Sequence, residues 1–157
     1  MKLSIRKGLS FGLASSIITT LGLIVGLQSS TNSRVAVISG ILIIAVADTL
    51  SDALAMHMSE ESDKQKGKRD IWESTGSTFV SKFFFAMTFL VPVALLPLYH
   101  AIIASIAWGL LLIILLSIYV AKIQKENVFN AVASHVAISI IVVVASHYIG
   151  KLINTLL

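Results

Sequence analysis

Apolar residues in this chain occur in long blocks that are separated by short polar segments. A block of about 20 apolar residues crosses the hydrocarbon core of a bilayer as an α-helix. The pattern predicts five membrane-spanning helices, over residues 8–28, 35–58, 78–98, 101–121 and 128–149. The longest polar segment covers residues 59–77. We therefore expect an all-α integral membrane protein that forms a single transmembrane domain over residues 1–157.

The composition agrees with a membrane protein. Of the 157 residues, 56% are hydrophobic and 13% are charged, whereas about a quarter of the residues of a soluble domain are charged. The chain has no cysteine, which excludes disulfides, thiolate metal sites and cysteine nucleophiles. The net charge of +4 does not indicate a nucleic-acid partner, because basic residues gather beside membrane spans on the cytoplasmic side.

The basic residues that flank the spans predict the orientation of the chain. With a cytoplasmic amino terminus, ten of the 12 basic residues belong to the cytoplasmic side: Lys2, Arg6, Lys7, Lys64, Lys66, Lys68, Arg69, Lys82, Lys122 and Lys125. Only Arg34 and Lys151 then belong to the other side. We expect a cytoplasmic amino terminus, a carboxyl terminus on the opposite side, and a cytoplasmic loop over residues 59–77.

Several residues predict how the spans end and pack. Lys82, near the start of the third span, is expected to extend its side chain to the membrane surface. Pro92 is expected to kink this span and Pro97 to end it. The fourth span has almost no polar residue and is expected to face lipid. Small residues at spacings of three and four in the first span favour close helix packing: Gly8, Gly12, Ser15, Thr19, Gly22 and Gly26.

The second span carries two acidic residues, although a carboxylate near the bilayer centre costs about 2.5–3.5 kcal/mol. At 100° per residue, the following residues share a sector of about 80° on one helix face: Asp48, Asp52, Met56, Ser59 and Asp63. Carboxylate oxygens suit divalent cations and a thioether favours softer ions, so this set favours a transition metal. Metal ions and protons would compete for the same oxygens.

Simpler interpretations of the same residues remain open. Asp48 and Asp52 can form a structural polar contact between helices. The acidic residues that follow are either cytoplasmic entry ligands or a solvated helix end: Glu60, Glu61 and Asp63. We expect His135 and His147 to be packing or interfacial residues. The four histidines and eight acidic residues show no spacing typical of a nucleophile or a metal hydrolase, so we do not expect an enzyme.

The first two spans resemble those of the vacuolar iron transporter family. In that family the first span carries a threonine pair and then an apolar run with a late glycine, as residues 12–27 do here. The family's second span has an acidic or amide residue eight positions before a methionine, followed shortly by a Gly-Glu pair. Asp48, Met56 and Glu60 stand at the matching places. Residues 146–152 are similar to the family's closing tyrosine-isoleucine-glycine stretch.

The resemblance implies a homodimer that exports ferrous iron, and also manganese, in exchange for protons. The metal path would run between the first and second spans of the two subunits. The transported ion is cargo, and no permanently bound cofactor is expected. The expected metal ligands are Asp48, Asp52, Met56 and Glu60, and the expected path or entry residues are Ser15, Thr19, Glu61 and Asp63. The short loops favour a prokaryotic plasma membrane as the location.

Two departures from the family pattern bear on this hypothesis. The family's first-span aspartate falls at Ser15 here, and its large cytoplasmic metal-binding insert is reduced to residues 59–77. Asp52 is a candidate replacement for the missing carboxylate, in which case an aspartate at position 15 would rescue an Asp52→Ala variant. The departures also support a second hypothesis, a non-transporting membrane scaffold or assembly protein that kept the transporter fold.

Overall fold

The computed structural model describes residues 2–156, which form six helices and no strand. The helices are α1 (Leu3–Thr31), α2 (Arg34–Glu61), α3 (Lys68–Thr88), α4 (Leu90–Leu95), α5 (Leu98–Gln124) and α6 (Val128–Leu156). Because α3 and α4 form one continuous segment, five segments are long and apolar enough to cross a membrane. The prediction of an all-α chain with five spans is confirmed, whereas the orientation of its termini stays a prediction.

The helices extend beyond the predicted spans at most of their ends. The third begins at Lys68 rather than at residue 78, so the polar segment 59–77 is mostly helical and its irregular part is short. The last helix continues through Lys151 to Leu156. Helices of 27 to 29 residues are about 40 Å long at 1.5 Å per residue, longer than the hydrocarbon core. Their ends therefore reach the level of the headgroups.

Both prolines act as predicted. Pro92 has no N–H to donate to the carbonyl of Thr88, four residues earlier, and α3 ends at that residue. The amide of Phe89 instead donates to the carbonyl of Ala86 at 3.2 Å, and α4 starts at the next residue. Pro97 lies in the short connection before α5. The kink and the end of the third span are thus confirmed.

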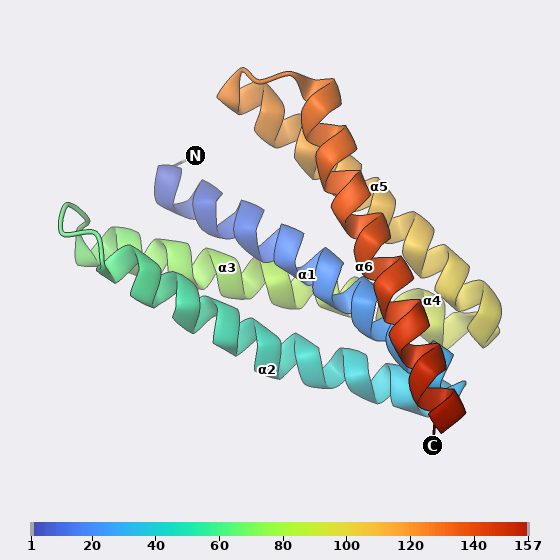
Figure 1. Cartoon of the computed structure of the whole chain (residues 1–157). Coiled ribbons are helices and arrows are strands. Elements are labelled where there is room, and N and C mark those ends of the chain that lie inside the picture. The colour runs from blue at the N-terminus through green and yellow to red at the C-terminus, as the bar shows by residue number, and fades with distance from the viewer. Residues whose placement is uncertain (1, 157) are drawn as a thin grey trace.

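Helix α1 is the centre of the bundle and packs against α2, α3, α5 and α6 (Figure 1). Its buried apolar residues join one core with those of the other helices. The predicted close packing of its small residues is confirmed at Gly12, where an added Cβ would lie 2.6 Å from the carbonyl oxygen of Thr78 on α3. On another face, a Cβ on Gly22 would lie 3.1 Å from Val142 of α6.

Hydroxyl groups join α1 to α3 along their length. Ser74 Oγ donates to the carbonyl of Ser4 at 3.1 Å, and Thr78 Oγ1 donates to that of Gly8 at 3.3 Å. In the opposite direction, Ser16 of α1 donates to the carbonyl of Lys82 at 3.0 Å. Such hydrogen bonds between small polar side chains and backbone stabilise helix pairs in lipid. They fix the level at which Lys82 lies beside α1.

The least covered helix is α6, and the expectation that the fourth span faces lipid holds for only one side of α5, where Leu111 and Leu115 are exposed. Among the described residues of α6 only Ser139 and Gly150 are buried, whereas α5 has buried residues along its whole length. The buried side of α5 includes Gly109, where an added Cβ would lie 2.6 Å from Leu21 of α1. A small residue at that position allows α5 to pack closely on the central helix.

The two histidines of α6 have the packing role expected of them. His147 Nδ1 lies 2.8 Å from Ser29 Oγ of α1, and His135 Nδ1 lies 2.8 Å from Ser117 Oγ of α5. Figure 1 shows α5 and α6 as an antiparallel hairpin that diverges from α1 at the end holding the amino terminus. These two hydrogen bonds therefore connect α6 to helices that it covers only in part.

Candidate membrane ion site

Side chains from three helices meet in an ion-paired cluster, here called the Lys82 cluster: Ser15 of α1, Asp48 and Asp52 of α2, and Lys82 of α3. Lys82 Nζ lies 2.6 Å from Asp48 Oδ2 and also pairs with Asp52. Ser15 Oγ donates to Asp52 Oδ2 at 2.5 Å and accepts a hydrogen bond from Lys82 Nζ at 2.9 Å. One ammonium thus contacts two carboxylates and one hydroxyl.

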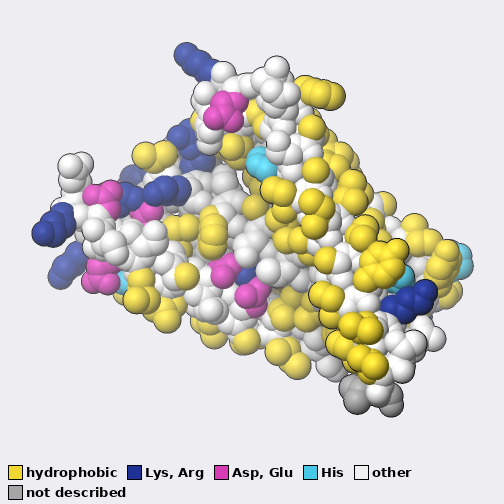
Figure 2. All heavy atoms as spheres, in the orientation of Figure 1, with side chains coloured by type: hydrophobic (Ala, Val, Ile, Leu, Met, Phe, Trp, Pro, Cys, Tyr) yellow, Lys and Arg dark blue, Asp and Glu magenta, His cyan; other side chains and the backbone are white. Residues whose placement is uncertain are grey.

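The Lys82 cluster lies at the middle of the predicted membrane. Asp48 is at the midpoint of α2, 14 residues after its start and 13 before its end. Lys82 is likewise 14 residues after the start and 13 before the end of the segment Lys68–Leu95. Each is thus about 20 Å from either end of its helix at 1.5 Å per residue. Figure 2 shows acidic side chains among apolar ones on this part of the surface, apart from those at the helix ends.

The prediction that Lys82 extends to the membrane surface is wrong. Its exposed fraction is 1%. The earlier start of α3 places Lys82 at mid-helix rather than near an end. An isolated ammonium is costly at that depth, so it is paired with the carboxylates of the neighbouring helix. Without Lys82, nine of the basic residues belong to the predicted cytoplasmic end, which still favours the expected orientation.

The cluster contains more negative than positive charge. With all three groups ionised, two carboxylates face one ammonium, which leaves a net charge of −1. The Asp48 and Asp52 side chains keep exposed fractions of 31% and 21%, whereas that of Lys82 keeps 2%. The ammonium is therefore enclosed and the carboxylates are accessible from one side. Such a site attracts a further positive charge, either a cation or a proton.

Other predicted ligands lie nearby but outside the cluster. Met56 is buried one turn beyond Asp52 on α2. Thr19 is exposed, and its hydroxyl donates to the carbonyl of Ser15 at 2.8 Å, within its own helix. Within residues 2–156, no three histidine, aspartate or glutamate side chains are grouped closely enough to hold a metal ion. A metal at this site would therefore bind the two aspartates, and its remaining ligands would not include a third carboxylate or a histidine of the described residues.

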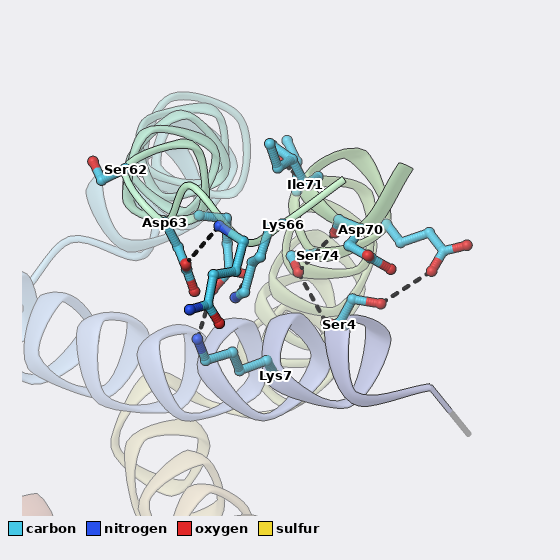
Figure 3. Close-up of polar contacts among 12 residues, drawn as sticks. Ser4, Lys7, Ser62, Asp63, Lys66, Asp70, Ile71 and Ser74 are labelled. Carbon is cyan, nitrogen blue, oxygen red and sulfur yellow. Dashed lines mark hydrogen bonds and ion pairs between the residues drawn. The ribbon is translucent and has the colours of Figure 1, made fainter. Parts of the chain in front are cut away.

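Glu60 belongs to a separate cluster at the end of α2. It is 2% exposed, its Oε1 accepts a hydrogen bond from Lys7 Nζ of α1 at 2.7 Å, and its Oε2 pairs with Lys66. Figure 3 shows Lys7 and Lys66 reaching into the same space beside Asp63. Glu60 follows Asp52 by eight positions, which is about 12 Å along the helix. The predicted metal ligands are thus divided between two levels.

The remaining predicted entry residues are exposed. Glu61 and Asp63 lie at the end of α2 and just beyond it. Asp63 Oδ1 accepts a hydrogen bond from the amide of Gln65 at 3.1 Å, so part of its role is to hold the short turn before α3. Both residues lie near Glu60 in the chain, at the end of the molecule that is predicted to be cytoplasmic.

Sequence reasoning missed the role of Lys82, although a signal for it was present. Lys82 is the only lysine or arginine inside the five predicted spans. Two acidic residues in mid-membrane need a positive partner, and a single basic residue at that depth is the natural candidate. The predicted third span begins at residue 78, so Lys82 is expected near the membrane surface and not at the depth of the two aspartates.

Comparison with known proteins adds no family assignment. No protein-family model matches the chain, and no match is found among curated proteins. The resemblance to vacuolar iron transporters therefore rests on the motifs of the first two spans and stays a prediction.

Proposed function

We propose that this protein is a secondary transporter that exports a divalent cation in exchange for protons. Asp48 and Asp52 bind the cation, and Lys82 competes with it for the same oxygens. The observation that supports this is the charge of the Lys82 cluster: two accessible carboxylates face one enclosed ammonium at mid-membrane depth. A purely structural contact would gain more from balanced charges, because an unmatched charge is costly in lipid.

The Lys82 ammonium allows the site two states, and in each state a positive charge is paired with the carboxylates of Asp48 and Asp52. In one state it neutralises part of the charge of Asp48 and Asp52, as the structure has it. In the other, a cargo cation binds the same oxygens, and the ammonium keeps its hydrogen bond to Ser15. Release of the cargo is then assisted by the return of the lysine. A site that alternates in this way avoids the cost of two unpaired carboxylates in a medium of low dielectric constant.

Ferrous iron and manganese are the first cargo ions to test. Two carboxylates suit a divalent cation, and the buried thioether of Met56, one turn from Asp52, favours a transition metal over magnesium or calcium. The resemblance to vacuolar iron transporters suggests the same ions. Glu60 pairs with two lysines at the predicted cytoplasmic end, so it would have to exchange them for the cation to act at the entrance.

The test is cation flux in proteoliposomes under an imposed pH gradient. We expect the wild type to move ferrous iron or manganese faster with the gradient than without it. The Asp48→Asn variant, which removes one carboxylate charge, is expected to lose this flux. Glu126→Gln is the matched control, because Glu126 is exposed in the connection between α5 and α6 and is outside the cluster; it is expected to keep the flux. Equal flux with and without protein, for both ions, would refute the proposal.

A scaffold function is the second candidate, and one observation favours it. The Lys82 cluster connects α1, α2 and α3, so it can serve to hold these helices together. Replacing its charged members together by neutral residues of similar size (Asp48→Asn, Asp52→Asn and Lys82→Met) separates the two functions. A scaffold would show no gradient-driven flux in the wild type or in this variant, and its assembly would weaken in the variant because the contacts that hold the three helices are lost. A transporter would keep its fold and lose all gradient-driven flux.

A further inference from the structure

A second polar feature lies at the end of the molecule that holds the amino terminus. A pocket of about 290 Å³ lies between the start of α1 and the end of α5. Its polar lining consists of Arg6, Lys7, Ser10, Tyr119 and Gln124, and its apolar lining of Leu3, Val120 and Ile123. None of the described residues that line it is acidic. Figure 2 shows basic side chains gathered at this end, so the pocket is positively charged.

Arg6 is available to an incoming anion. Its guanidinium forms no ion pair or hydrogen bond within the part of the chain that the structure describes, and the residue is half-buried. The neighbouring lysines differ, since Lys2 pairs with Glu73 and Lys7 with Glu60. A guanidinium presents a planar set of N–H donors that matches the oxygens of a phosphate. Arg6 therefore supplies the unneutralised charge of the pocket.

An apolar groove of about 420 Å³ continues from this pocket. Ser10 and Tyr119 line both the pocket and the groove. The aliphatic and phenyl lining of the groove comes from three helices: Leu9, Leu13, Phe85, Leu112, Leu115 and Leu116. Along α1 the lining passes from Leu3 and Arg6 in the pocket to Leu9 and Leu13 in the groove, from the helix end toward its middle. The polar part thus lies at headgroup level, and the apolar part lies deeper.

We propose that the pocket and the groove together bind one anionic phospholipid, with its phosphate at Arg6 and one acyl chain in the groove. This arrangement matches the orientation of a lipid in the bilayer, with the headgroup at the surface and the chain directed inward. Basic pockets between membrane helices select anionic headgroups. A soluble phosphate ester would fill the polar pocket and leave the groove empty. The inference does not depend on the proposed cation transport, because Arg6 is outside the Lys82 cluster.

The test is lipid binding to the purified full chain in detergent, measured by native mass spectrometry. Phosphatidylglycerol is expected to bind more tightly than phosphatidylcholine with the same acyl chains. Arg6→Gln is expected to weaken the binding of phosphatidylglycerol about tenfold, because a hydrogen-bonded charge pair is lost. Lys122→Gln is the matched control: Lys122 is exposed in the last turn of α5 and does not line the pocket. It is expected to change the affinity less than about twofold.

Three outcomes would overturn the lipid site. Equal binding of the two lipids would show an unselective apolar surface. Equal weakening by Arg6→Gln and Lys122→Gln would show a diffuse effect of charge. Displacement of the lipid by glycerol phosphate at similar concentration would show a site for soluble phosphate esters. If Arg6→Gln loses helix content by circular dichroism, Arg6→Lys replaces it; this variant keeps the charge and is expected to bind with intermediate affinity.

Discussion

At the scale of single residues, the cost of charge in lipid explains why Asp48, Asp52 and Lys82 lie together. Each of them alone would be unfavourable at mid-membrane depth. Together they share one ammonium between two carboxylates, and Ser15 adds a hydroxyl contact. Among the described residues, Asp48 and Asp52 are the only acidic partners of this ammonium. The stability of the fold and the chemistry of the site therefore depend on the same lysine.

Replacing Lys82 by methionine is expected to destabilise the fold by about 3 kcal/mol, the lower end of the range for breaking a buried ion pair. The lower end applies because both aspartates are partly exposed. The measurement is the free energy of unfolding in mixed detergent micelles. Adding Asp48→Asn and Asp52→Asn to Lys82→Met is expected to restore most of the loss, since no charge then remains unpaired. A Lys82→Met variant as stable as the wild type would contradict the ion pairing.

The sequence predicted the acidic part of the site but not its positive partner. Asp48 and Asp52 were recognised because their spacing places them on one face of a helix whose apolar residues are unambiguous. The expected position of Lys82 is wrong because residues 68–77 are mostly polar, and hydropathy cannot separate a polar helix extension from a loop. Tertiary packing decides which side chains of different helices meet. The hydropathy pattern of a single sequence gives no direct information on that packing.

At the scale of helices, the same limit appears for α5 and α6. Hydropathy ranks α5 as the most apolar segment and therefore suggested that it faces lipid. In lipid, however, apolar side chains gain little by leaving the bilayer for a helix interface. Small residues that allow close approach decide which helix faces pack, as Gly109 of α5 and Gly150 of α6 do against α1. The stripe of small residues in α1 was thus a better predictor of position than mean hydropathy.

The close contact of α1 with α3 predicts opposite effects of alanine at two glycines of α1. Gly12→Ala would place a Cβ 2.6 Å from a backbone carbonyl of α3, whereas Gly26→Ala would meet its nearest atom at 3.7 Å. Overpacking costs about 1–3 kcal/mol, and alanine gains about 1 kcal/mol of helix propensity over glycine. We expect Gly12→Ala to lower the unfolding free energy and Gly26→Ala to maintain or raise it. The same unfolding measurement checks both, and equal effects would contradict the close α1–α3 contact.

At the scale of the whole molecule, charge is distributed unevenly between the two ends. Nine basic residues lie at the end that holds the amino terminus, and Arg34 and Lys151 lie at the other. Figure 1 places the α2–α3 and α5–α6 connections at the first end, and the α1–α2 connection and the carboxyl terminus at the second. The excess of basic residues in short connections predicts that the first end is cytoplasmic. The proposed cation export, with entry at Glu60, requires this orientation.

The absence of native cysteine allows a direct test of orientation, because single cysteines can be introduced without background. Gln65→Cys lies between α2 and α3, and His100→Cys lies near the start of α5, where both native residues are exposed. In intact cells, a membrane-impermeant maleimide is expected to label His100→Cys and not Gln65→Cys. After permeabilisation both should react, which controls for accessibility. The reverse pattern would place Glu60 and the Arg6 pocket outside the cytoplasm, and the transporter would then have to import its cargo through that entrance.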